Sequence, residues 1–123
     1  MRKVKMIFGD VVLEAEVLDT PTADAIYAAL PIEGSANTWG DEVYFSTPVS
    51  ADQEPEARDV MEPGDIAYWP PGSAIAIAYG PTPASHGSEL RLASPSNVWA
   101  RALGDVTDLR AVAPGTSIKV EAG

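Results

Sequence analysis

The start of the chain alternates apolar and polar residues with the two-residue period of a β-strand. One alternating stretch covers residues 3–8, a second covers residues 11–17, and Gly9-Asp10 lies between them. Glycine suits the first central position of a type II′ turn, because that position requires a positive φ. The pattern predicts an opening β-hairpin.

Beyond residue 18 the apolar residues change to the spacing of one helical face. They stand at Ala23, Ile26, Tyr27 and Leu30. Thr20 can cap the N-terminus of such a helix, Pro21 suits its first position and Pro31 stops it. A second short helix is predicted after the capping residue Asp105, and Pro114-Gly115 ends it.

Turn residues divide the rest of the chain into short strands. We expect two arms around Gly40-Asp41 within residues 32–46, and further strands over residues 66–69, 74–79, 89–93, 97–103 and 118–121. The acidic, proline-containing stretch 48–59 is long for a hairpin connection, so it is expected to form an exposed loop.

The strand expected over residues 74–79 divides its side chains by size. Large residues share one face and alanines share the other, at Ile75, Ile77 and Tyr79 and at Ala74, Ala76 and Ala78, respectively. Small side chains let another element of the fold approach closely. Both faces of this strand are therefore expected to be buried.

About eight short strands, two short helices and frequent turns predict a mainly β fold. A closed antiparallel barrel fits best, because closure leaves the fewest unpaired strand edges. A two-sheet sandwich is the alternative. The chain has 123 residues, which suits a single domain spanning 1–123.

Composition narrows the classes of partner and compartment. Eighteen acidic against eight basic residues give a net charge of −10, which repels nucleic acid and anionic membrane surfaces. The many acids within residues 41–65 are interpreted as a solvated loop rather than a cation-binding site. No membrane span or export signal is visible and cysteine is absent, so a cytoplasmic location is expected.

A single histidine, His86, excludes histidine pairs and multi-histidine metal sites within one chain. Residues 64–72 match half of the second cupin motif, a glycine followed after five residues by Pro-x-Gly. Ile75 stands where that motif places its metal-binding histidine, and no His-x-His precedes it. We therefore expect neither a metal nor an organic cofactor.

A wider resemblance covers nearly the whole chain. After the hairpin it rests on Thr20-Pro21-Thr22-Ala23, Leu30-Pro31-Ile32-Glu33-Gly34, Trp39-Gly40-Asp41-Glu42-Val43-Tyr44-Phe45, residues 64–72 and Tyr79-Gly80-Pro81-Thr82-Pro83. In these segments the chain resembles the small bacterial and archaeal cyclophilin-like family of uncharacterised function. The resemblance implies a cyclophilin-type eight-stranded barrel closed by helices at its two ends.

The chain departs from true cyclophilins at their catalytic strand. Those enzymes use an arginine in a Phe-His-Arg strand and a Gln-Gly-Gly-Asp stretch, whereas residues 36–45 contain neither arginine nor histidine and the stretch is missing. Loss of the arginine should weaken isomerisation sharply, because this group assists the amide as it loses resonance. Arg91 or Arg101 could replace it only if the fold brings one of them to the same cleft.

Aromatic residues near the predicted turns are the best candidates to line a ligand pocket. The predicted ligand-binding residues are Trp39, Glu42, Tyr44, Phe45, Tyr68, Trp69 and His86. For the aromatics, packing in the core is the alternative. For Glu42 and for His86, which lies in a Gly/Pro/Ser loop, the alternative is plain exposure to solvent.

The leading hypothesis is a cyclophilin-like domain that binds a small molecule or short peptide in an aromatic cleft, without the catalytic arginine motif. Two alternatives stay open. One is an active peptidyl-prolyl isomerase that uses a substitute arginine, and the other is a structural or oligomerisation module, including a homodimer formed through an edge strand.

Overall fold

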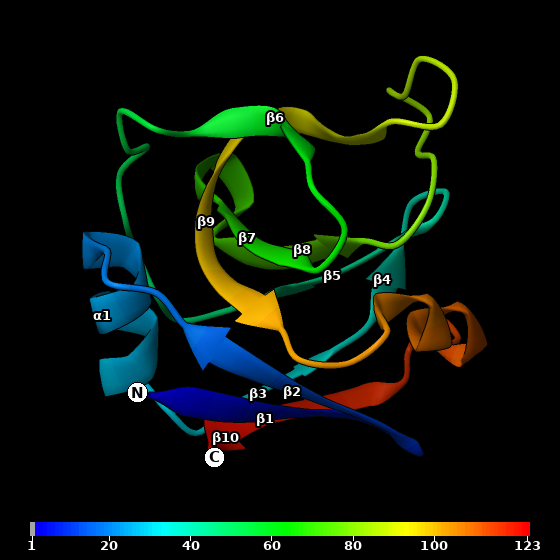
Figure 1. Cartoon of the computed structure of the whole chain (residues 1–123). Coiled ribbons are helices and arrows are strands. Elements are labelled where there is room, and N and C mark those ends of the chain that lie inside the picture. The colour runs from blue at the N-terminus through cyan, green and yellow to red at the C-terminus, as the bar shows by residue number, and fades with distance from the viewer. Residues whose placement is uncertain (1) are drawn as a thin grey trace.

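Antiparallel pairing joins the strands into one wall that curves round on itself (Figure 1). The computed structural model describes residues 2–123. These contain one α-helix, α1 (Pro21–Ala28), and two 3₁₀ helices, η1 (Pro70–Gly72) and η2 (Val106–Ala111). The ten strands are β1 (Lys3–Phe8), β2 (Val11–Val17), β3 (Ile32–Ser35), β4 (Asn37–Thr38), β5 (Glu42–Ser46), β6 (Arg58–Met61), β7 (Asp65–Trp69), β8 (Ala74–Ala78), β9 (Leu90–Ala102) and β10 (Ser117–Ala122).

A single bent strand closes the barrel. The strands follow the order β3-β10-β1-β2-β9-β7-β8-β5-β4, and β6 pairs with β9 outside this path. The first and last strands of the path, β3 and β4, are consecutive in the chain and are separated by Ala36 alone. The Ala36 amide donates to the Thr116 carbonyl oxygen over 2.8 Å. The predicted mainly β antiparallel barrel is therefore confirmed.

Local signals fixed the hairpin and the first helix. Gly9 has a φ of +64°, as the predicted turn between β1 and β2 requires. Thr20 caps α1, since its side-chain oxygen accepts a hydrogen bond from the Ala23 amide over 3.0 Å. Ala23 and Ile26 on the predicted apolar face are fully buried.

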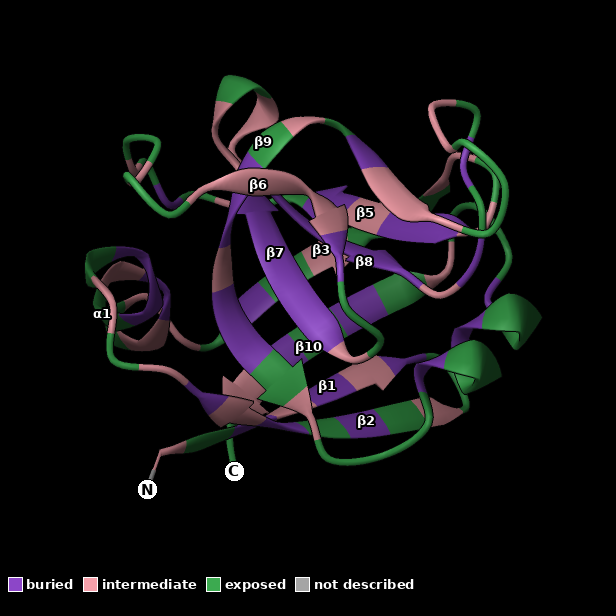
Figure 2. Ribbon diagram, turned by 45° about the horizontal axis from the view of Figure 1, so that its top comes forward, coloured by how far each residue is buried: buried purple, intermediate pink, exposed green. Residues whose placement is uncertain are grey.

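The barrel interior holds the main core, which appears as buried positions along the strands in Figure 2. The Phe8 and Phe45 rings meet edge to face with centroids 6.3 Å apart. Ile26 of α1 and Leu109 of η2 are both fully buried in this core. The two helices lie on opposite sides of the barrel (Figure 1), so their apolar side chains cover its two ends.

A second, smaller apolar layer lies outside the barrel wall. Strand β6 pairs with the first half of β9, and in Figure 1 the two lie together above β7 and β8. Between them pack Met61, Ala67, Ala76, Ala78 and Leu92. The alanine face of β8 is thus buried beneath another element, as expected from its small side chains.

The structure differs from the sequence expectation in four elements, the first of which is the single arm expected before Gly40-Asp41, divided at Ala36 into β3 and β4. Strand β6 begins inside the stretch that was expected to be an exposed loop, and the expected strands 89–93 and 97–103 form one strand, β9. Pro95 is accommodated there because it lies in an irregular part of the β6–β9 pairing, between the partners of Arg58 and Val60. The second helix is a 3₁₀ helix, capped as predicted by Asp105, which accepts from the Thr107 amide over 2.9 Å.

Within residues 2–123 we find no helix with both the length and the apolar character needed to cross a membrane.

Candidate functional site

A hollow forms on the outer face of β5, β8 and β7 because small side chains stand between large ones. Tyr44 pairs across the strands with Ala76, and Trp69 pairs with Ala74. Side chains alternate between the two faces of a strand, so these four point away from the barrel core. The alanines fill little space, and the two aromatic side chains therefore become walls above an alanine floor.

The resulting pocket has a volume of about 200 Å³. It is lined by Trp39, Glu42, Tyr44, Trp69, Ala74, Ala76, Leu92 and Ala93. Leu92 and Ala93 come from β9, which crosses the hollow from the outer layer. The lining is thus apolar and aromatic apart from one carboxyl group.

A tight turn places Trp39 beside Glu42. The Trp39 amide donates to the Glu42 carbonyl oxygen over 3.0 Å, across the turn residues Gly40 and Asp41. Gly40 has a φ of +59°, and a β-carbon there would lie 2.8 Å from Cδ of Pro83. The loop that contains Pro83 therefore packs directly on the turn and holds this corner of the pocket in place.

Two contacts hold the Trp69 side chain. Its indole N–H donates to Oγ of Ser94 on β9 over 2.7 Å. A β-carbon on Gly72 would lie 2.6 Å from Cζ3 of the Trp69 ring, so the ring rests against the glycine backbone. Trp69 is therefore fixed before any ligand arrives, which lowers the entropy cost of binding.

Glu42 is the polar group of the pocket. Its side chain is buried, with 6% exposed, and Oε1 has no hydrogen-bond partner among the described residues. Burial raises the pKa of Glu42 from 4.5 to about 7, because the charged form loses hydration. A carboxyl group in this state can accept a hydrogen bond, pair with a cation, or donate a proton near neutral pH.

Comparison with known proteins identifies the family. The sequence model of the family described as cyclophilin-like matches residues 2–121. The chain belongs to the cyclophilin-like family. The solution structure of the hypothetical protein AF2241 from Archaeoglobus fulgidus is similar, with 41% identity and a TM-score of 0.84, over 98% of this chain and 93% of that one.

A more distant structure shares the cyclophilin-like fold. The structure of McbB in complex with tryptophan aligns with a TM-score of 0.69 over 98% of this chain and 44% of McbB. The identity is 13%, so this likeness concerns the fold. No curated protein matches the chain.

The cyclophilin-like barrel brings four of the seven predicted ligand-binding residues together, namely Trp39, Glu42, Tyr44 and Trp69. Glu42 is buried rather than solvated. The four residues come from the β4–β5 turn, β5 and β7. That they bind a ligand stays a prediction.

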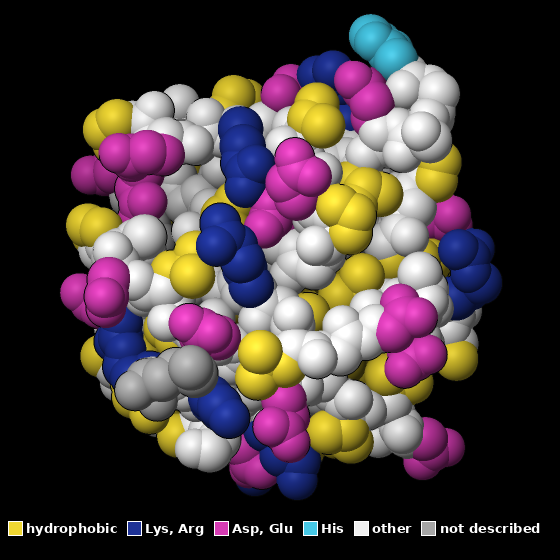
Figure 3. Space-filling model, in the orientation of Figure 1, with side chains coloured by type: hydrophobic (Ala, Val, Ile, Leu, Met, Phe, Trp, Pro, Cys, Tyr) yellow, Lys and Arg dark blue, Asp and Glu magenta, His cyan; other side chains and the backbone are white. Residues whose placement is uncertain are grey.

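The other three predicted residues lie elsewhere. Phe45 and Tyr68 are fully buried in the barrel core, where the Tyr68 hydroxyl donates to the Val49 carbonyl oxygen over 2.6 Å. Each is the sequence neighbour of a lining residue, so strand alternation turns it to the opposite face. The His86 side chain is 85% exposed, and the one histidine of the chain projects from the molecule in Figure 3.

Residues that sequence reasoning missed form the floor and the cover of the pocket. The sequence predicts that Ala74 and Ala76 allow close packing, but their role as a floor depends on which residues flank them across the sheet. Leu92 and Ala93 carried no signal, because the path of β9 over the pocket depends on contacts distant in sequence.

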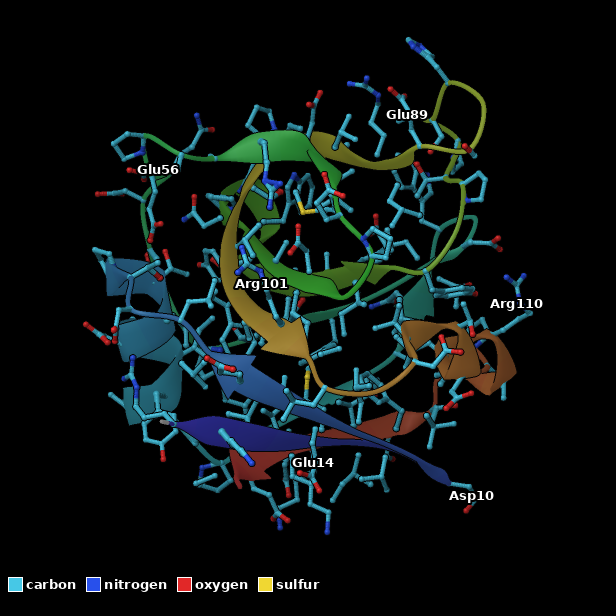
Figure 4. The ribbon with its side chains drawn as sticks, viewed as in Figure 1. Asp10, Glu14, Glu56, Glu89, Arg101 and Arg110 are labelled. Atoms are coloured by element: carbon cyan, nitrogen blue, oxygen red, sulfur yellow. The ribbon has the colours of Figure 1, made fainter. Side chains whose placement is uncertain are left out.

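Neither candidate arginine lines the pocket. Arg91 is held by Asp59 at 2.6 Å and by Glu89 at 2.9 Å, and its hydrogen bond lowers the pKa of Glu89. Arg101 lies 3.4 Å from Asp65, beside a different groove. Figure 4 shows Glu89 and Arg101 in separate parts of the molecule. The condition for a substitute catalytic arginine in the aromatic cleft is not met.

A second groove, between α1 and β9, is bordered by an internal polar network. The Asn97 side chain donates to Thr22 Oγ1 over 2.9 Å and accepts from the Glu54 amide over 2.8 Å. Glu54 in turn accepts from the Thr22 amide at the start of α1. Because these groups satisfy one another, the groove ties a loop to the helix, and the aromatic pocket is the better candidate site.

Proposed function

We propose that this cyclophilin-like protein binds a small molecule in the aromatic pocket. The observation that carries the proposal is the buried Oε1 of Glu42, which has no hydrogen-bond partner within residues 2–123, in a pocket that Trp39, Tyr44 and Trp69 also line. A buried polar atom without a partner costs free energy, and a ligand donor would satisfy it. The combination of apolar walls with one placed polar group is typical of small-molecule sites.

The volume sets the size of the ligand. A cavity of roughly 150 Å³ holds one benzene molecule, whereas pockets for drug-sized ligands begin at about 300 Å³. The present pocket, at about 200 Å³, suits a group of one ring or a compact alkyl group of similar size. A short peptide, the alternative ligand, would insert one side chain into the pocket.

The proposal needs no metal or organic cofactor. Within residues 2–123, acidic and histidine side chains form no group of three or more with the arrangement of a metal site. The groups available in the pocket are three aromatic rings and one carboxyl group, which can hold and orient a ligand.

A fragment screen tests the proposal. Small aromatic, alkyl, amine and amide compounds are added while thermal unfolding and tryptophan fluorescence are measured, and tryptophan is included because McbB has been solved with it. A ligand at a free concentration of about 100 times its Kd stabilises the folded state by about 2.7 kcal/mol, which raises the unfolding temperature measurably.

Two variants locate the binding. Ala74→Leu fills the pocket floor and should abolish the stabilisation by any hit, whereas Ala113→Leu adds the same group at an exposed position and should not. The proposal is wrong if no compound shifts the unfolding temperature, or if hits stabilise the Ala74→Leu variant as much as the unmodified protein.

A further inference from the structure

We propose that the group held in the pocket is a substituted ammonium, the positively charged part of a small organic cation. This inference rests on the proposed function and adds the chemical class of the ligand. It follows from the charge of the lining residues, the nature of the walls and the net charge of the chain.

The charge of the pocket is unbalanced. Glu42 and Tyr44 are its two titratable lining residues, and lysine, arginine and histidine do not line it. The neighbouring acid Asp41 has its own cation, Arg110, at 3.5 Å, and Arg110 also lies over the Tyr79 ring. Among the residues that the structure describes, Glu42 has no such partner, so a ligand that brings a positive charge would balance it.

The walls suit a cation that carries apolar substituents. Trp39, Tyr44 and Trp69 contribute three aromatic side chains to one hollow. The face of an aromatic ring attracts a cation, and quaternary ammonium ligands are recognised in aromatic cages of this composition. Alkyl substituents on the nitrogen would contact the alanine floor, whereas a bare ammonium is strongly hydrated and would lose that water.

The net charge of the whole chain also favours a positively charged ligand. The chain carries a net charge of −10, which raises the local concentration of small cations and lowers that of anions. An anionic ligand would in addition face the buried Glu42 carboxyl without a basic group beside it. A neutral ligand that accepts a hydrogen bond from the protonated Glu42 carboxyl group is the competing case, and the experiment separates the two.

Choline and neohexanol, its uncharged carbon isostere, form the decisive pair. Each is titrated at constant ionic strength while the three tryptophan indole N–H signals are followed by NMR. Trp39 and Trp69 line the pocket and should shift, whereas Trp99 is fully buried in the barrel core and serves as an internal reference. We expect choline to bind about tenfold more tightly than neohexanol.

A matched pair of variants tests the role of the carboxyl group. Glu42→Gln keeps the shape and removes the charge, and should weaken choline binding about tenfold without changing neohexanol binding. Glu14→Gln removes the same charge from the exposed face of β2, at the position labelled in Figure 4, and should leave both affinities unchanged.

The source of the ammonium group is tested with a short peptide that carries one trimethyl-lysine. Tighter binding of this peptide than of choline would indicate a side chain of a partner, and equal or weaker binding would indicate a free molecule. The peptide decides only the source of the group, because the comparison of choline with neohexanol decides whether it is an ammonium.

Failure of this inference differs from failure of the proposed function. Equal binding of choline and neohexanol, or hits from the fragment screen that are all uncharged, would leave a binding pocket and overturn the ammonium assignment. A complete lack of hits, choline included, would overturn both. The choline and neohexanol comparison uses the unmodified protein, so it decides even if the Glu42→Gln variant folds poorly.

Discussion

The indole ring of Trp69 occupies the space that a β-carbon on Gly72 would need. The distances from that β-carbon would be 2.6 Å to Cζ3 and 2.7 Å to Cε3 of the ring. Pro70 and Pro71 form the turn η1 between the two residues. A glycine in a short turn thus controls the position of one wall of the pocket.

Gly72→Ala is therefore expected to displace the Trp69 ring. The added methyl group should lengthen or break the indole bond to Ser94 and lower the free energy of unfolding by about 1 to 3 kcal/mol. Urea unfolding and the Trp69 indole N–H signal in NMR measure the two effects. Gly104→Ala is the matched control, because its β-carbon would make only an ordinary contact, 3.9 Å from Leu13. Equal behaviour of the two variants would contradict the role of Gly72.

Glu42→Gln should make the protein more stable at pH 8. The unfolded chain releases the Glu42 proton near pH 4.5, whereas the folded pKa is about 7. Between these values the folded state holds a proton that the unfolded state has lost, so the stability of the unmodified protein falls as pH rises through this window. The loss is about 3 kcal/mol in total, and glutamine avoids it.

Urea unfolding curves at several pH values test this expectation. The difference between Glu42→Gln and the unmodified protein should vanish below pH 4.5, grow between pH 4.5 and 7, and stay constant above. The Glu14→Gln variant should run parallel to the unmodified protein. A Glu42→Gln curve that also runs parallel would show that Glu42 titrates as an ordinary exposed acid.

Arg58→Met should destabilise the fold more than Arg91→Met. Arg58 lies 2.6 Å from Asp65, which is 2% exposed, so its removal weakens the pairing of a buried carboxylate and costs up to about 3 kcal/mol, since Asp65 keeps Arg101 at 3.4 Å. Arg91 pairs with Asp59, which is 42% exposed, and the loss of a surface pair costs about 1 kcal/mol or less. Chemical denaturation of both variants gives the comparison, and a larger loss for Arg91→Met would refute the ranking.

Prolyl isomerisation is expected to proceed at its uncatalysed rate, over roughly tens to hundreds of seconds. The aromatic pocket lacks an arginine, and both candidate arginines are engaged by acids elsewhere. A protease-coupled assay on a proline tetrapeptide, with a true cyclophilin as positive control, measures the rate. Catalysis that disappears in Arg91→Ala or Arg101→Ala would establish the isomerase alternative.

The elements with local signals could be predicted from the sequence, and those that depend on distant pairing could not. Gly9 predicts a turn because glycine readily adopts a positive φ, and Thr20 predicts a helix start because its side chain can cap the helix. Strand β6 contains Arg58 and Asp59 and shows no clear alternation. It is a strand because β9, about thirty to forty positions further along the chain, pairs with it.

The pocket could be predicted in part for the same reason. Trp39 and Glu42 flank a recognisable turn, so their proximity follows from the sequence. The sequence does not show which of Tyr44 and Phe45 faces the pocket. Strand β5 is covered on both faces, so either side chain could face the core. Only the position of the outer layer shows that Tyr44 faces the pocket.

Side chains alternate along β5, β8 and β7, so one face of this part of the sheet packs in the barrel core and the other lines the pocket. Ile75 and Ile77 maintain the barrel, whereas Ala74 and Ala76 set the depth of the pocket. Substitutions on the outer face could therefore change which ligand is accepted while the architecture persists. Such a wall allows a family of barrels to diversify in specificity without refolding.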